Sequence, residues 1–144
     1  MTHITDSRLK EAHIAHMNAQ TGQEVLIVDN DEDDLLALDG ELKELGHAPM
    51  TTWSGIEALS LLQSRRFDVL LVDSYLPDMY IGDFLERVSQ LPARPKIWVM
   101  QAKPTQDTCI YESQCFSVVG KRQVAQIFER LGTDMNGNIS EPSA

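Results

Sequence analysis

Short runs of apolar residues alternate along the chain with segments of helical period. The runs are rich in β-branched residues and are mostly apolar at every position, as expected of parallel strands buried on both faces. They lie at residues 25–28, 48–52, 67–72, 97–100 and 116–119. Because strands alternate with helices, the pattern predicts an α/β fold, a doubly wound five-stranded parallel sheet with helices on both faces.

The first predicted helix begins with four acidic residues at 31–34, which complement the positive end of a helix dipole. Its leucines recur at helical spacing, and Gly46 is well placed to end the helix. These leucines are Leu35, Leu38, Leu42 and Leu45.

The second predicted helix begins with a capping-box signature, Ser54 followed three residues later by Glu57. Apolar residues at helical spacing predict the inward positions of the second, third and last helices. They are Ile56, Leu59 and Leu62, then Phe84, Leu85 and Val88, and finally Val124, Ile127, Phe128 and Leu131. Between residues 103 and 114 the helical signal is weak, so a short and irregular segment is expected there.

A chain of 144 residues has the size of one ordinary domain, which we place at residues 24–131. Residues 1–23 form an N-terminal extension that allows a loosely amphipathic helix, whose apolar face is expected to pack on the domain or on another copy. The sequence therefore leaves open whether the chain forms a homodimer. Residues 132–144 are polar and predict a flexible tail.

The charge of the chain argues against two classes of partner. Twelve Lys and Arg residues against 22 Asp and Glu residues give a net charge of −10, which repels nucleic-acid phosphates and anionic membranes. The chain has no apolar run long enough for a membrane span or a signal peptide, which predicts a cytoplasmic protein. Its two cysteines, Cys109 and Cys115, are expected to be free thiols there.

Polar side chains follow four of the predicted strands at the point where each strand ends. In a parallel α/β sheet these ends face a common crevice, where such folds place their sites. The residues at the strand ends are Asp29 and Asn30, Asp73, Gln101 and Ala102, and Gly120 and Lys121. Two carboxylates, two amides and one ammonium are therefore expected to converge.

The two carboxylates predict a metal ion and a nucleophile. Clustered carboxylates repel one another, and all-oxygen ligation suits Mg²⁺. A carboxylate beside such a cation and Lys121 can attack a phosphoryl group, because the cations neutralise its oxygens, and Asp73 is the candidate. Taken singly, each residue also has a structural explanation, as a strand end, a helix cap or a solvated lysine. Their shared position on three strands favours function.

At these residues the chain resembles the receiver domains of two-component response regulators, over roughly residues 24–131. The stretch Val25-Leu-Ile-Val-Asp-Asn-Asp-Glu is similar to the family's first strand with its acidic pair. The stretch Phe67-Asp-Val-Leu-Leu-Val-Asp-Ser-Tyr-Leu-Pro-Asp-Met is similar to its phosphoacceptor strand and loop. Met100-Gln-Ala and Val118-Val-Gly-Lys resemble the ends of the fourth and fifth strands. The resemblance implies a flavodoxin-like fold.

The resemblance also implies a role for each site residue. Asp73 is expected to take a phosphoryl group from a phosphohistidine on a sensor histidine kinase or phosphotransfer protein. Lys121 is expected to pair with the phosphate, and Gln101 stands where the family has a residue that contacts the phosphoryl group. The implied magnesium ligands are Asp29, Asn30, Asp73 and the backbone carbonyl of Tyr75.

Four positions depart from the family. Asn30 replaces the second acidic residue and carries no charge, which predicts weaker magnesium binding. Gln101 replaces a hydroxyl residue, Val118 replaces the aromatic switch residue, and Arg122 replaces the proline after the lysine. The usual two-position switch is therefore expected to be missing. The compressed segment at 103–114 predicts a reshaped output face.

The match and the departures lead to two hypotheses. The first is a stand-alone receiver, phosphorylated on Asp73, that signals through protein contacts and catalyses at most its own phosphorylation and dephosphorylation. The alternative is a pseudo-receiver, an interaction module that signals without phosphate, which Asn30, Gln101 and Val118 favour. A metal-dependent phosphatase or a nucleotide-binding flavodoxin-like protein is less favoured, since the sequence has neither class's motif.

Overall fold

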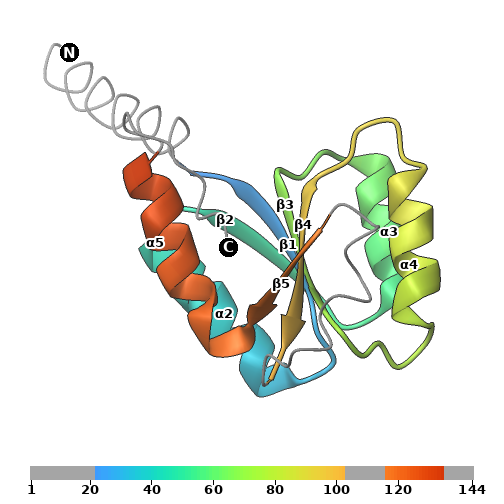
Figure 1. Ribbon diagram of the computed structural model, residues 1–144, viewed down its shortest axis with the longest axis horizontal. Helices are drawn as coiled ribbons and strands as arrows, with labels where there is room; N and C mark the ends of the chain where they lie inside the picture. The colour runs from blue at the N-terminus through green and yellow to red at the C-terminus, as the bar shows by residue number, and fades with distance from the viewer. Residues whose placement is uncertain (1–21, 103–115, 135–144) are drawn as a thin grey trace, which may run out of the picture.

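The computed structural model describes residues 22–102 and 116–134. Within these residues five strands form one parallel sheet in the order β2-β1-β3-β4-β5, which confirms the predicted doubly wound α/β fold (Figure 1). The strands are β1 (Glu24–Val28), β2 (Ala48–Thr52), β3 (Val69–Asp73), β4 (Lys96–Gln101) and β5 (Ser117–Gly120).

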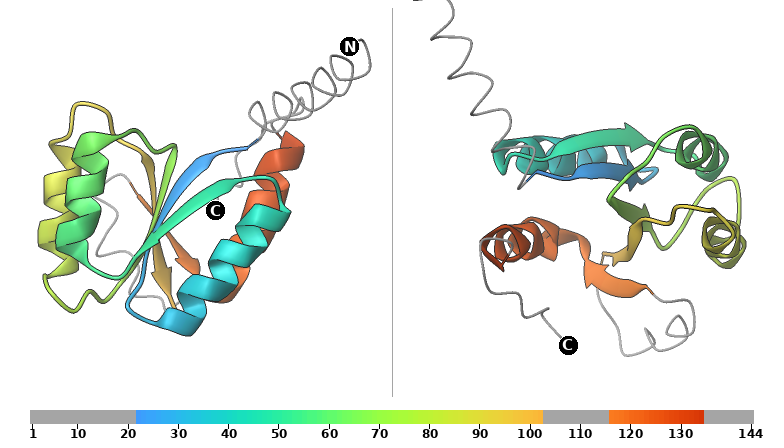
Figure 2. Two further views of the ribbon diagram at one scale, coloured as in Figure 1. Left: turned by 180° about the vertical axis from the view of Figure 1, so that it is seen from behind. Right: turned by 90° about the horizontal axis from the view of Figure 1, so that it is seen from above.

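Helices cover both faces of the sheet. Figures 1 and 2 show α2 and α5 together on one face and α3 and α4 together on the other. The helices are α2 (Glu32–Glu44), α3 (Gly55–Ser64), α4 (Ile81–Ser89) and α5 (Val124–Asp134), with a short 3₁₀ turn, Lys121–Gln123, between β5 and α5. None of these helices is long and apolar enough to cross a membrane.

The sheet separates two hydrophobic cores. Successive residues of a strand point to opposite faces, so each central strand supplies both cores, which explains its continuous apolar run. In β3, Leu70 and Val72 pack beneath α3 and α4, whereas Val69 and Leu71 pack beneath α2 and α5. The same alternation holds for β1 and β4.

Helix α2 begins and ends close to where the sequence predicts. Asp31 caps its start, because the Asp31 carboxylate accepts the Asp34 backbone N–H at 3.0 Å. After the helix ends, Gly46 has φ of 90°, a region that disfavours other residues. Leu38 and Leu42 are buried along the inner face, as predicted from their spacing.

The inward face of α3 differs from the prediction. Ile56 is 65% exposed, whereas the helix buries a different set of positions. The buried set is Gly55, Ala58, Leu59 and Leu62. Its spacing is that of one helical face, and Ile56 stands one residue, about 100°, away from it. The expectation for Ile56 was therefore wrong, while those for Leu59 and Leu62 are confirmed.

The capping box predicted for α3 is only half present. The Ser54 hydroxyl accepts the backbone N–H of Glu57 at 3.1 Å, as expected. The Glu57 carboxylate, however, accepts the hydroxyl of Thr52 instead of the backbone N–H of Ser54. That N–H donates to the Thr52 hydroxyl at 3.4 Å.

The bounds of β2 agree with the prediction, and those of the other strands differ from it by one or two residues. The difference is clearest in β3, which begins at Val69 although Phe67 is buried. Several expectations fall outside the described residues. They are the N-terminal helix, the segment at 103–114, both cysteines and the tail beyond residue 134.

Candidate functional site

The register of the sheet brings the ends of its strands together. Val28, the last residue of β1, pairs with Val72 of β3, so Asp29, which follows β1, and Asp73, which ends β3, lie side by side. On the other side of β3, Asp73 pairs with Met100, and Gln101 then pairs with Gly120 of β5. The sites predicted at the strand ends therefore share one edge of the sheet.

Asp29 is the most deeply placed polar residue of this edge, with no exposed surface. Its Oδ1 accepts the backbone N–H of Asp31 at 3.0 Å, which fixes the carboxylate against the start of α2. Its Oδ2 lies 2.9 Å from Nζ of Lys121. This second contact is an ion pair without the alignment of a hydrogen bond, so Oδ2 is a buried acceptor that no described residue supplies with a hydrogen-bond donor.

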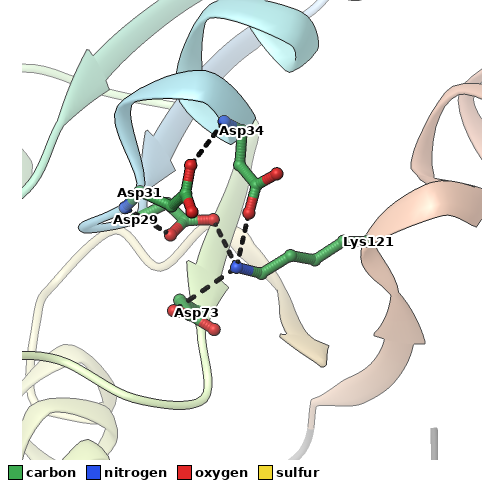
Figure 3. Close-up of polar contacts among 5 residues, drawn as sticks. All are labelled: Asp29, Asp31, Asp34, Asp73 and Lys121. Carbon is green, nitrogen blue, oxygen red and sulfur yellow. Dashed lines mark hydrogen bonds and ion pairs between the residues drawn. The ribbon is translucent and has the colours of Figure 1, made fainter. Parts of the chain in front are cut away.

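Lys121 reaches the site from the turn after β5. The backbone N–H of Gly120 donates to the side chain of Gln123 at 3.3 Å and helps to close that turn. From there the lysine side chain, only 15% exposed, places Nζ 3.5 Å from Oδ2 of Asp73. The expected convergence of Asp29, Asp73 and Lys121 is thus found (Figure 3).

Asp34 is a fourth member of the cluster that was not predicted. Its Oδ2 accepts a hydrogen bond from Nζ of Lys121 at 2.9 Å. The N-terminal cap of α2 orients it, because its own backbone N–H is held by Asp31 (Figure 3). The run of four acids was the only signal in the sequence, and dipole complementation was a sufficient explanation for all four.

The cluster perturbs the acid–base properties of its members. Burial and the charge of Asp29 raise the pKa of Asp73 from 3.8 to about 6, although Lys121 and the backbone N–H of Tyr75 lower it in part. Burial works against the charged form of Lys121, yet its contacts with Asp29 and Asp34 and the charge of Asp73 raise its pKa. The lysine is therefore a fixed cation beside a carboxylate that resists ionisation.

The remaining predicted residues surround this core of the site. Asn30 is exposed directly after Asp29. Tyr75 holds Asp73 through its backbone, while its ring is exposed. Gln101 is half-buried at the end of β4, and its Oε1 has no hydrogen-bond partner among the described residues. The structure thus places Gln101 at the predicted edge of the sheet, but no described residue forms a hydrogen bond with its Oε1.

The loop after Asp73 is tied to the start of α3. The carboxylate of Asp78 accepts the backbone N–H groups of Gly55 and Ile56, both at 2.9 Å, and the Ser54 hydroxyl at 3.1 Å. Burial raises the pKa of Asp78, but these hydrogen bonds together outweigh burial, so the pKa of Asp78 is lowered. One carboxylate therefore stabilises the helix and fixes the loop that carries Tyr75.

The carboxylates of this site are too few to hold a hard cation alone, so other oxygen ligands are needed as well. Among the described residues, no three His, Cys, Asp or Glu side chains are grouped so that they could hold a metal ion. Asp29 and Asp73 supply two carboxylates, and Oδ2 of Asp29 is a buried oxygen suited to a cation, with the ammonium of Lys121 2.9 Å away. The Asn30 amide and a backbone carbonyl are further oxygen donors of the kind Mg²⁺ accepts, so the residues fit magnesium.

The comparison with protein families agrees with this geometry. The family model of the response regulator receiver domain matches residues 25–130. The chain therefore belongs to the response regulator receiver domain family. Domains of this family are signalling domains of two-component systems.

A named relative is Probable histidine kinase 1 of Oryza sativa subsp. indica, 26% identical over 95 residues. The match covers 65% of this chain but only 10% of that protein, so the chain spans a small part of its relative.

Solved structures show the same fold. The N-terminal domain of a response regulator receiver protein from Methanoculleus marisnigri JR1 is 26% identical, with a TM-score of 0.62, and the match covers 77% of this chain and 94% of that one. Chemotaxis response regulator CheY4 of Vibrio cholerae is 19% identical, with a TM-score of 0.68 and coverage of 76% and 98%. The receiver domain of a sensor histidine kinase from Pseudomonas aeruginosa PAO1, solved with magnesium in its active-site cleft, is 20% identical, with a TM-score of 0.64 and coverage of 78% and 98%.

Proposed function

We propose that this receiver domain is a phosphoacceptor, in which Asp73 takes a phosphoryl group from a phosphohistidine of a sensor histidine kinase or phosphotransfer protein. The observation that carries the proposal is the position of Lys121. Its Nζ lies between the carboxylates of Asp29 and Asp73, 2.9 and 3.5 Å away, although the three residues stand at the ends of three different strands. A largely shielded cation beside a strand-end carboxylate is what phosphoryl transfer to that carboxylate requires.

The transfer is a displacement at phosphorus. An oxygen of the Asp73 carboxylate forms a bond to phosphorus as the bond from phosphorus to the imidazole nitrogen breaks. The imidazole keeps the electron pair and takes up a proton, and Asp73 becomes an acyl phosphate. Lys121 offsets the charge of the phosphoryl oxygens, and the backbone N–H of Tyr75 holds the carboxylate in place.

Asp29, Asn30, Asp73 and the backbone carbonyl of Tyr75 would hold Mg²⁺, which supplies a second positive charge to the phosphoryl oxygens. The magnesium in the cleft of the Pseudomonas aeruginosa receiver domain supports this assignment. Asn30 contributes an uncharged oxygen, so the site binds the ion more weakly than a site with three carboxylates. Gln101 offers an amide that can donate to the phosphoryl group.

The proposed signal passes through protein contacts. The partners are the phosphohistidine donor and a downstream protein, and the net charge of −10 suits basic patches on both. A cytoplasmic location agrees with such partners and remains a prediction from the sequence.

A pseudo-receiver that signals without phosphate is the second candidate. The Oε1 of Gln101 favours it, because it has no hydrogen-bond partner among the described residues. A longer amide stands there in a half-buried position where the family has a small hydroxyl side chain. Asn30 favours it as well, because it removes one negative charge from the proposed metal site.

Phosphorylation by a small-molecule donor distinguishes the two candidates. The protein is incubated with phosphoramidate or acetyl phosphate over a wide range of Mg²⁺ concentration and followed by intact mass. We expect the gain of one phosphoryl group that depends on Mg²⁺, is lost in Asp73→Asn and is retained in Asp83→Asn, an exposed acid of α4. A wild-type protein that gains no mass at any Mg²⁺ concentration would favour the pseudo-receiver.

A further inference from the structure

The ammonium of Lys121 is shared unequally among three carboxylates. Its aligned hydrogen bond goes to Asp34, at 2.9 Å, and not to either of the two buried carboxylates. The contact with Asp29, also at 2.9 Å, leaves Oδ2 without a hydrogen-bond donor, and Asp73 is farther away at 3.5 Å. The strongest directional hold on Lys121 therefore comes from α2.

This arrangement matters because Lys121 and a divalent cation need the same oxygens. Asp29 and Asp73 are the two carboxylates of the proposed magnesium site, and an ammonium bonded to both of them competes with the metal. The side chain of Asp34 is 41% exposed and extends from the first turn of α2 toward Lys121 (Figure 3). Its hydrogen bond anchors the ammonium at the start of α2, while Oδ2 of Asp29, 2.9 Å from the same ammonium, receives no aligned hydrogen bond from the described residues.

We propose that Asp34 is a positioning residue that holds the ammonium of Lys121 by a hydrogen bond, so that Lys121 makes no hydrogen bond to Asp29 or Asp73, the two carboxylates of the proposed Mg²⁺ site. Asp34 touches neither the metal nor the phosphoryl group in this role. It restores to the site a negative charge that Asn30 lacks, on the first turn of α2. This role rests on the proposed function, because it concerns the same magnesium site.

A double-mutant cycle between Asp34 and Lys121 tests the proposal through the binding of Mg²⁺ alone, measured by calorimetric titration of the full chain. Asp34→Asn is expected to weaken Mg²⁺ binding about fivefold or more, because Lys121 then bonds to the buried carboxylates. Asp33→Asn removes the same charge from an exposed neighbouring position of α2 and is expected to weaken binding less than about twofold. In a Lys121→Met background, Asp34→Asn is expected to change binding by less than about twofold as well.

The direct contact is tested separately by urea unfolding without metal. Asp34→Asn and Lys121→Met are expected to shift the unfolding midpoint non-additively, whereas Asp33→Asn and Lys121→Met should add. Additive shifts for Asp34 would overturn the proposal whatever the metal does. So would equal effects of Asp33→Asn and Asp34→Asn on Mg²⁺ binding, or an Asp34→Asn effect that persists without Lys121. Wild-type protein that binds no Mg²⁺ would refute the proposed metal site itself, and with it this role of Asp34.

Discussion

Lys121 is a single ammonium among three carboxylates, which leaves the cluster with an excess of negative charge. Asp29 and Asp73 are both buried, so water cannot screen their repulsion well. Burial and this repulsion together raise the pKa of Asp73 to about 6. In the absence of a metal ion, the ionised form of Asp73 therefore opposes folding.

Replacement of Asp73 by Asn is expected to stabilise the metal-free protein above pH 6. The folded-state pKa of Asp73, about 6, lies above the ordinary value of 3.8. The stabilisation that protonated Asp73 gives to the folded state is therefore complete below pH 3.8 and is lost as pH rises through about 6. Asn cannot ionise, so Asp73→Asn should raise the free energy of unfolding at pH 7.5 by about 1 to 2 kcal/mol.

Urea unfolding in EDTA at several pH values provides the measurement. The difference between Asp73→Asn and the wild type should shrink as pH falls from 7.5 to 4, and Asp83→Asn should show no such trend. A variant that is less stable than the wild type at pH 7.5 would mean that the ion pair with Lys121 outweighs burial and the repulsion by Asp29.

Some of the site residues could be predicted from the sequence and others could not. Asp29, Asp73 and Lys121 could be predicted because parallel strand ends must share an edge, whatever the side chains do. Asp34 could not, since its part depends on where the first turn of α2 directs the side chain. Gln101 was placed at the correct edge, but the lack of a partner for its Oε1 among residues 22–102 and 116–134 depends on atomic packing, which no sequence pattern reports.

Asp78 joins two elements that flank the site, the loop after β3 and helix α3. It accepts two backbone N–H groups from the first turn of α3, which lack partners within the helix. Because the same residue belongs to the loop after Asp73, the stability of α3 and the order of that loop are coupled.

Replacement of Asp78 by Ala is expected to loosen both elements. The loss of a side-chain acceptor at a helix start costs about 1 to 2 kcal/mol in the free energy of unfolding. Glu86→Ala, at an exposed position of α4, should change it by less than about 0.5 kcal/mol.

Hydrogen exchange locates the effect of Asp78→Ala. The amides of Gly55 and Ile56 and the loop around Tyr75 should exchange faster in the variant, while β1 and β3 keep their relative protection. Uniform acceleration over all elements would show that Asp78 supports global stability alone and does not fix the loop.

The elements themselves were predictable where burial is complete. The central strands are apolar at every position because both cores use them, so their existence did not depend on a choice of face. Helix α3 shows the limit of such reasoning. Its true inner face includes Gly55 and Ala58, which are too small to give a strong hydrophobic signal, so Ile56 was assigned inward in their place.

Across the whole domain, a signal from Asp73 must travel through the sheet to another surface. Val118 of β5 is half-buried against the core beneath α3 and α4, and it has neither the ring nor the hydroxyl of the family's switch residue. A phosphoryl group shifts a conformational equilibrium only through contacts that differ between two states. With Gln101 and Val118 at these positions, few such contacts are available.

Phosphorylation is therefore expected to change the environment of the site but not of β5. Amide chemical shifts with and without beryllium fluoride, a phosphoryl mimic, should differ at Asp29, Asp73 and Lys121 and stay nearly constant at Val118. A Gln101→Thr, Val118→Tyr double variant restores both switch side chains and should extend the changes to β5. Large changes at Val118 in the wild type would show that the domain has a switch of the usual kind.

The identity of the phosphorylated residue tests the central claim most directly. The protein is treated with a phosphodonor and Mg²⁺, the acyl phosphate is reduced with borohydride, and the modified residue is found by peptide mass spectrometry. We predict that Asp73 carries the modification and that Asp29 and Asp34 do not. Modification of another residue, or its persistence in Asp73→Asn, would contradict the assignment of Asp73 as the phosphoacceptor.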